Sequence, residues 1–189
     1  VIWNSPEHIK VKPFYHYDEF QENYAPHKGN ASFRICQNIF VHDLDKSISR
    51  ANKSIDRGAE SIRFTIQDDK IDVTKLLESL PLKKITVYFN LSFLSNDFVK
   101  KIEGIAKEKK AFVFCNLDPI GQLSQDGNWF LTREKDNFET LNLLSNHIVN
   151  SSFLSIDGSL YQNAGANMVQ QIAYSLSHAN EYFNRITTI

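Results

Sequence analysis

Ala111-Phe112-Val113-Phe114-Cys115-Asn116-Leu117 is the stretch of the sequence that decides the fold class. Phe112 to Cys115 are apolar at every position, which is typical of a parallel strand covered on both faces. Four other short segments rich in Ile, Val, Phe or Tyr are predicted strands: 34–41, 61–67, 84–90 and 152–157. The sequence therefore predicts an α/β protein with buried strands.

Segments with apolar residues at helical spacing separate and follow these strands. Their apolar stripes span 44–55, 73–80, 98–106, 138–148 and 169–183. Gly58 and Pro81 are expected to end the first two helices, and Ser95 to cap the third. Strand–helix units repeated in this way fit either an open doubly wound sheet or a segment of a (β/α)8 barrel. No GxGxxG or GxxxxGK[ST] loop favours a nucleotide-binding doubly wound domain.

The first thirty residues differ from the rest of the chain. They are rich in aromatic residues and proline and show no clear period: Trp3, Pro6, Pro13, Phe14, Tyr15, Tyr17, Phe20, Tyr24 and Pro26. Such a segment packs either on its own domain or on a partner, and both interpretations stay open. We therefore divide the chain into an N-terminal extended arm, residues 1–30, and a barrel-type domain, residues 31–189.

Composition limits the classes of function. The chain has 189 residues, 42% of them hydrophobic and 23% charged, as in one soluble domain. Its formal net charge of −1 does not supply the positive field that nucleic-acid binding needs. No apolar run reaches the roughly 20 residues that cross a membrane, and no signal peptide is recognised. Cys36 and Cys115 lie in apolar runs, which favours buried free thiols and a cytoplasmic location.

No catalytic, cofactor-binding or metal-binding residue is predicted. No histidine pairs with another histidine or a cysteine at metal-ligand spacing; the six are His8, His16, His27, His42, His147 and His178. The acidic pairs Asp43/Asp45 and Asp68-Asp69 fall at predicted loops and helix starts, where caps are expected. Asn116 to Gly121 follows the end of a predicted strand, where barrels place functional loops. Its Pro and Gly nevertheless favour a plain turn.

Three stretches together resemble methylmalonyl-CoA mutases. Glu7-His8-Ile9-Lys10-Val11-Lys12-Pro13-Phe14-Tyr15 is similar to the opening Glu-Gly-Ile-x-Val-x-Pro-Leu/Phe-Tyr segment, with His8 where Gly is usual. Asp118-Pro119-Ile120-Gly121 is similar to the Asp-Pro-Ile/Leu-Gly loop of the small subunits. Ile156-Asp157-Gly158 through Asn163-Ala164-Gly165-Ala166, followed by Gln170 to Tyr174 and Glu181-Tyr182, resembles the strand-to-helix segment before an Ala-rich helix. There the Ala-Gly-Ala run is expected to let the helix start close to the sheet.

The resemblance implies an incomplete (β/α)8 TIM barrel holding about the first five βα units. In the catalytic subunits a CoA ester threads through this barrel and adenosylcobalamin caps it. The Asp-x-His-x-x-Gly motif whose His ligates cobalt is absent from these 189 residues. Catalytic subunits carry Gly-Tyr-His after the fifth strand, and the aligned residues here are Gly158-Ser159-Leu160. Leucine neither donates a hydrogen bond nor carries a proton, and Tyr161 is offset by one residue.

These features predict a small, non-catalytic subunit of an adenosylcobalamin-dependent methylmalonyl-CoA mutase, inactive by itself and binding no cofactor. Its partner would be the large subunit, in a heterodimer. Two alternatives are a stand-alone acyl-CoA-binding α/β domain and an unrelated α/β domain whose motifs match by chance. Five units cannot close an eight-stranded barrel, so two strand edges stay unpaired. We expect the isolated chain to self-associate, to flatten into an open sheet, or to cover these edges with its arm.

Overall fold

The structure is a computed structural model that describes residues 1–19, 33–148 and 152–186. The predicted boundary between arm and barrel, at residues 30 and 31, lies outside the described residues, as do Phe20, Tyr24, Pro26 and His27. The described residues belong to a two-stranded hairpin, one parallel sheet and the helices around it.

Five parallel strands form one sheet in the order β3-β4-β5-β6-β7. They are β3 (Cys36–Phe40), β4 (Ser61–Ile66), β5 (Thr86–Leu91), β6 (Phe112–Leu117) and β7 (Ser152–Leu154). Each strand pairs with the next one in the sequence, whereas a doubly wound sheet reverses direction. The structure thus confirms the α/β class and settles the open choice in favour of a partial, barrel-like arrangement.

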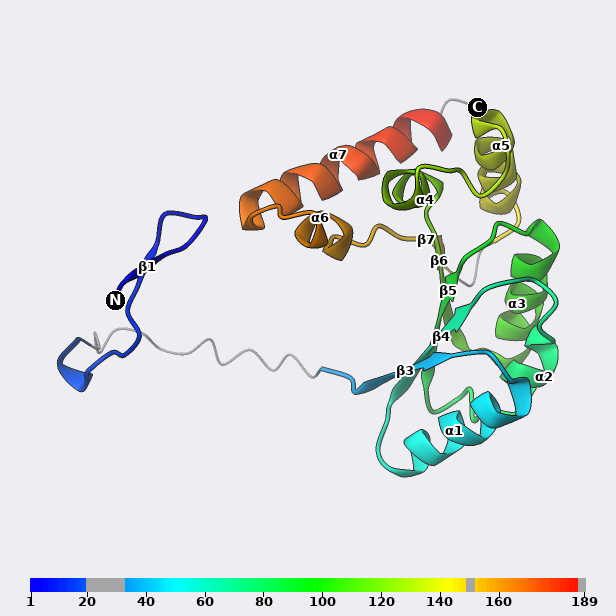
Figure 1. Cartoon of the computed structure of the whole chain (residues 1–189). Helices are drawn as coiled ribbons and strands as arrows, with labels where there is room; N and C mark the ends of the chain where they lie inside the picture. Colours follow the sequence, from blue (N-terminus) through cyan, green and yellow to red (C-terminus); the bar gives the residue numbers. More distant parts are fainter. Residues whose placement is uncertain (20–32, 149–151, 187–189) are drawn as a thin grey trace.

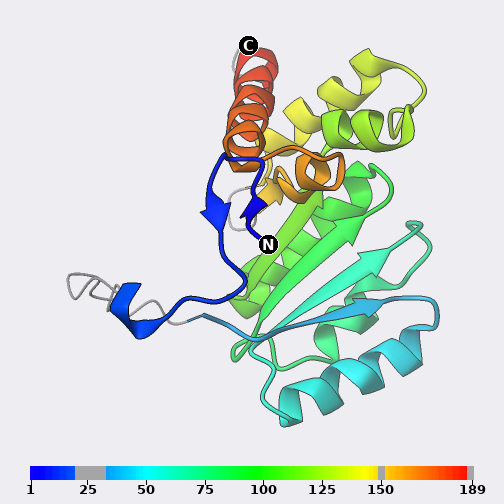
Figure 2. The ribbon, with the colours of Figure 1, turned by 60° about the vertical axis from the view of Figure 1, so that its left-hand side comes forward.

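Seven helices are described: α1 (Leu44–Asp56), α2 (Val73–Glu78), α3 (Asn96–Lys109), α4 (Pro119–Asp126), α5 (Glu134–Ser145), α6 (Ser159–Asn163) and α7 (Met168–Ile186). Helices α1, α2, α3 and α5 lie along one face of the sheet, α4 and α6 lie beyond the carboxyl ends of the strands, and α7 lies on the side of edge strand β7 (Figures 1 and 2). Ser95 caps α3 as predicted, accepting a hydrogen bond from Phe98 N at 3.4 Å. None of these described helices is long and apolar enough to cross a membrane.

The hydrophobic core fills the space between the sheet and its helices. Every second residue of the three central strands is buried there: Ile62, Phe64, Ile66, Val87, Phe89, Leu91, Val113, Cys115 and Leu117. From the helices, Leu76, Leu77, Ile102 and Leu144 are fully buried against them. Each such side chain contributes about 1.5–3 kcal/mol to the free energy of unfolding. The predicted helical stripes at 44–55, 73–80, 98–106 and 138–148 are therefore core positions.

The opposite face of the sheet is not covered by helices (Figure 1). Phe112 is 66% exposed and Phe114 37% exposed, while Val113 and Cys115 are buried. The prediction that this strand is covered on both faces is therefore wrong. Side chains alternate along a strand, and right-handed crossovers bring the covering helices to one side. Cys36 lies exposed on edge strand β3, so the prediction of two buried thiols holds for Cys115 alone.

The described part of the arm forms a hairpin. Strand β1 (Trp3–Asn4) pairs antiparallel with β2 (Lys10–Val11), and a short 3-10 helix, η1 (Tyr17–Glu19), follows. In the turn, His8 has a φ of 62°, the left-handed region that favours the glycine usual there in the resembled segment. Among the described residues, the hairpin strands pair with each other and not with edge strands β3 or β7. The hairpin therefore does not cover the strand edges among the described residues, and self-association of the chain stays a prediction.

The two cysteines offer a direct test of which face of the sheet is covered. Burial, and then the nearby charge of Glu103, raise the pKa of the Cys115 thiol to about 12. We expect iodoacetamide at pH 8 to alkylate Cys36 in the native protein and to leave Cys115 unmodified, because the thiolate is the reactive form. Peptide mass spectrometry measures both sites, with protein in urea as the control in which both react. Equal rates at the two cysteines in native protein would contradict the structure.

Candidate functional site

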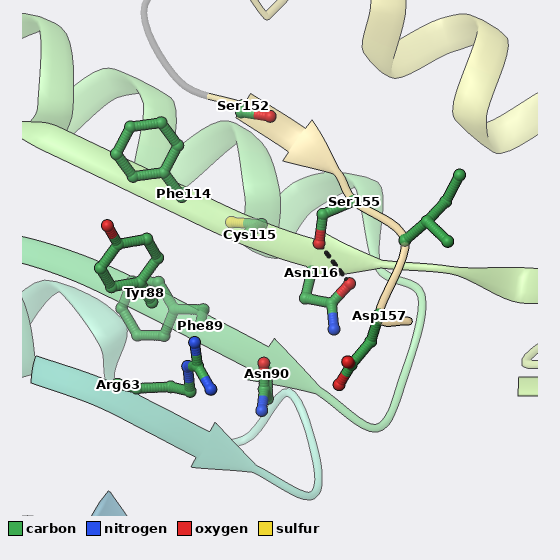
Figure 3. Close-up of a pocket in the computed structure, with 11 residues that line it drawn as sticks. Arg63, Tyr88, Phe89, Asn90, Phe114, Cys115, Asn116, Ser152, Ser155 and Asp157 are labelled. Carbon is green, nitrogen blue, oxygen red and sulfur yellow. Dashed lines mark hydrogen bonds between the residues drawn. The ribbon is translucent and has the colours of Figure 1, made fainter. Parts of the chain in front are cut away.

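A row of large side chains crosses the middle of the uncovered face. Parallel register places Arg63 on β4 beside Tyr88 on β5, and Tyr88 beside Phe114 on β6. The Arg63 guanidinium carbon lies 5.8 Å from the centre of the Tyr88 ring. The Tyr88 and Phe114 rings stack with centroids 5.3 Å apart. These three residues, which we call the aromatic row, fill the centre of this face (Figure 3).

The aromatic row forms part of a cavity of about 290 Å³ that extends toward the carboxyl ends of the strands. At that end the lining becomes polar, with Asn90, Asn116, Ser155 and Asp157 (Figure 3). Ser155 Oγ donates a 2.6 Å hydrogen bond to Asn116 Oδ1, which ties the segment after β7 to β6. The cavity therefore combines one cation, two aromatic rings and a cluster of hydrogen-bonding groups.

A second, larger pocket of about 780 Å³ continues from this polar end; we call it the edge pocket. It is bordered by α4 on one side and α6 on the other, and it shares Asn90, Asn116 and Asp157 with the first cavity. Its other lining residues include Asp118, Gly121, Gln122, Ser159, Leu160 and Asn163. No lysine, arginine or histidine is among the described residues that line it.

Asp118 to Gly121 is the start of α4, where the sequence predicted a plain turn. The Asp118 side chain caps this helix, because Oδ1 accepts a 2.8 Å hydrogen bond from Gly121 N. Pro119 occupies the first helical position, which tolerates a residue without a backbone N–H. A Cβ at Gly121 would lie 2.2 Å from Asp118 Oδ2. Glycine is therefore needed here because the capping carboxylate occupies the space of a side chain.

Asp118 is also the centre of a buried polar network with α6 and α7. Tyr182 donates a 2.5 Å hydrogen bond to Asp118 Oδ1 and accepts one of 3.0 Å from Ile120 N. His178 Nε2 lies 2.8 Å from the same oxygen, without the alignment of a hydrogen bond. On the other side of the ring, His178 Nδ1 lies 2.9 Å from the Tyr161 hydroxyl. We call Asp118, Tyr161, His178 and Tyr182 the Asp118 network.

The pKa values of the two tyrosines in this network do not favour a role as nucleophile or base. Burial, and then the charge of Asp118, raise the pKa values of Tyr161 and Tyr182 above their ordinary range. Both hydroxyls therefore stay protonated, and neither is activated as a nucleophile or base. The Tyr161 hydroxyl and Nδ1 of His178 share one hydrogen bond, and the tautomer of the imidazole decides which of them donates. The network positions α6 and α7 relative to Asp118.

The loop after β7 determines which side chains line the edge pocket next to α6. Ser159 and Leu160, at the start of α6, line it, whereas the Tyr161 hydroxyl is engaged by His178. The His178 side chain is only 1% exposed. Gly165, expected to allow close packing, instead has a φ of 94°, and a Cβ added to it would meet no atom within 4 Å. Its role is to end α6 in a left-handed conformation.

From the sequence alone, Asp118 is part of a loop and has no visible connection with His178. These residues are sixty positions apart, so their contact has no signature in spacing. One signal was available: His178 and Tyr182 are four residues apart on the side of α7 opposite its apolar stripe. Groups of three or more histidine, cysteine, aspartate or glutamate residues placed to hold a metal ion are absent from residues 1–19, 33–148 and 152–186.

Comparisons with known proteins identify a family. The family model described as "Methylmalonyl-CoA mutase" matches residues 66–188, well over half of the chain. No curated protein sequence matches significantly. Among solved structures, a dipeptide epimerase from Methylococcus capsulatus complexed with Mg ion is similar, with 15% sequence identity and a TM-score of 0.35. The similarity covers 43% of this chain and 25% of the epimerase, so the chain spans about a quarter of that protein.

The contact between Gly121 and Asp118 predicts the effect of one methyl group. We expect Gly121→Ala to lower the free energy of unfolding by about 1–3 kcal/mol, because the methyl group displaces the capping carboxylate. Gly104→Ala is the matched control, since Gly104 lies in α3 with no atom within 4 Å of where a Cβ would lie. We expect it to stabilise the protein by about 0.5–1 kcal/mol. Urea denaturation measures both, and equal effects of the two variants would contradict this assignment.

Proposed function

Because the chain belongs to the methylmalonyl-CoA mutase family, we propose that it is the small, non-catalytic subunit of an adenosylcobalamin-dependent methylmalonyl-CoA mutase. Such a complex interconverts (R)-methylmalonyl-CoA and succinyl-CoA. The observation that carries the proposal is Leu160 on the wall of the edge pocket. Catalytic subunits have an imidazole in this loop to hold the thioester carbonyl, and an alkyl side chain cannot replace it.

The aromatic row supports the same proposal. In catalytic subunits the CoA ester threads through the centre of the barrel, which requires space along the inner face of the strands. Here the stacked rings of Tyr88 and Phe114 stand on that face at one level, next to Arg63. Large side chains at the centre of a barrel favour a packed interior over a channel.

We assign no cobalamin ligand to this chain. In the catalytic subunits the histidine that ligates cobalt comes from a domain that follows the barrel, and its Asp-x-His-x-x-Gly motif is absent from these 189 residues. No described histidine lines the edge pocket. The most buried imidazole near it, His178, is held by Asp118 and Tyr161. We therefore assign the cofactor to the large subunit.

We assign partner contact to the N-terminal arm. Trp3, Phe14, Tyr15 and Tyr17 are all more than half exposed, which is an unusual cost for a segment without a partner. A single hydrogen bond, from Met168 N to Glu7 Oε1, ties the turn of the hairpin to the start of α7. The aromatic side chains are thus available to pack against the large subunit of a heterodimer. Two free cysteines agree with a location in the cytoplasm.

Size-exclusion chromatography followed by assay of each fraction tests this proposal. We expect the chain mixed with a catalytic large subunit of the family to elute with it as a heterodimer. With adenosylcobalamin and methylmalonyl-CoA added, fractions containing the large subunit should form succinyl-CoA, and the free chain should not. Separate elution would contradict the partner assignment, while turnover by the free chain would contradict the non-catalytic assignment.

Arg63 favours a second candidate function, the binding of an acyl-CoA by this chain alone. Its guanidinium is the only cation among the described residues that line the 290 Å³ cavity, next to two aromatic rings. If this function holds, calorimetry with succinyl-CoA will give a micromolar Kd that Arg63→Ala weakens at least tenfold. Arg50→Ala is the control, because Arg50 lies on α1, away from the cavity. The non-catalytic proposal expects no binding in any of the three proteins.

A further inference from the structure

Helix α7 is turned so that its apolar side faces away from the protein. Its apolar stripe consists of Val169, Ile172, Leu176 and Phe183, each between 63% and 71% exposed. The two buried residues of this 19-residue helix are instead His178 and Tyr182. A helix normally attaches through its apolar stripe. Polar contacts of the Asp118 network must therefore provide much of the attachment of α7.

The ring of Tyr182 also packs in the hydrophobic core, with its centroid 6.2 Å from that of Phe138, while the other polar contacts of α7 are exposed and correspondingly weak. Near its C-terminus, Arg185 pairs with Glu134 on α5 and with Glu181, and all three side chains are at least 38% exposed. At its N-terminus, Met168 N donates to Glu7 of the arm. Pairs of this kind contribute at most about 1 kcal/mol. The buried network is the stronger attachment, since its hydrogen bonds reach a charged group away from water.

We propose that the Asp118 network is a latch that holds α6 and α7, residues 159–186, as a hinged flap whose helix α6 forms one wall of the edge pocket. The sheet side of the latch is Asp118, at the end of β6, and the flap side is His178, Tyr182 and Tyr161. Glycines stand at both ends of α6, Gly158 and Gly165, where the backbone can change direction. This inference goes beyond the proposed function and does not depend on it.

The latch controls the shape of the edge pocket because the two walls of the pocket belong to its two sides. Asp118, Gly121 and Gln122 line the pocket from the α4 side. Ser159, Leu160 and Asn163, on the flap, line it from the other. Opening the latch would therefore widen the pocket and free the Tyr161 hydroxyl from His178. Local opening of this type is expected where few apolar contacts hold an element.

Hydrogen exchange of the whole chain, followed by mass spectrometry, tests the latch. Tyr182→Phe keeps the ring of Tyr182 in the core and removes the hydroxyl that donates to Asp118. We expect amides in 159–186 to exchange roughly tenfold faster or more, while those of β4, β5 and β6 keep their protection. Tyr174→Phe is the matched control on the same helix, because Tyr174 is 48% exposed and lies outside the network. It should leave exchange unchanged.

Tyr161→Phe provides a milder second variant if Tyr182→Phe lowers the yield of folded protein. It removes only the outer hydrogen bond, to His178 Nδ1, so faster exchange should again be confined to 159–186. The proposal would be overturned if exchange rose equally in 159–186 and in the central strands, since the network would then be part of the global core. It would also be overturned if both network variants exchanged like Tyr174→Phe.

Discussion

Right-handed crossovers place α1, α2, α3 and α5 on one face of a parallel sheet, and every other property of this protein depends on that constraint. One set of alternating strand residues enters the core, and the other set lines a face without helices. Strands of this kind bury both faces when the sheet curls into a closed barrel. Here the inner face carries the aromatic row, and the carboxyl ends of the strands carry the polar groups of the edge pocket.

One oxygen atom connects the elements at the carboxyl ends of the strands. Asp118 Oδ1 accepts hydrogen bonds from Gly121 N and Tyr182 and contacts His178, so it joins β6, α4 and α7. A carboxylate surrounded in this way has a structural role, because each partner occupies a position at which the oxygen could otherwise accept a hydrogen bond from a ligand. The same contacts keep the imidazole of His178 buried. The edge pocket therefore has the location of a barrel active site, and its described lining includes the carboxyl groups of Asp118, Asp126 and Asp157 but no lysine, arginine or histidine.

Sequence periodicity was sufficient for the elements that the core covers. The stripes of α1, α2, α3 and α5 and all five strands were predicted, since burial imposes regular spacing on them. Periodicity gave wrong predictions where burial does not determine the spacing of apolar residues. The all-apolar run at Phe112 to Cys115 has one side uncovered, and the apolar stripe of α7 faces outward. At α4 the sequence favours a turn because of Pro119 and Gly121. In the structure, both residues belong to the first turn of a helix that the Asp118 carboxylate caps.

The contact between Asp118 and His178 shows why a structural network is harder to predict from a sequence than a catalytic motif. A catalytic site needs particular residue types at matching positions, and such sets leave motifs that a single sequence can display. The Asp118 network needs only a buried carboxylate with enough donors around it, and its members come from segments sixty residues apart. The difference between Gly158-Ser159-Leu160 and the Gly-Tyr-His of the resembled catalytic subunits was visible in the sequence. How Tyr161 is withdrawn from the pocket could be learned only from the packing of α7 against α4.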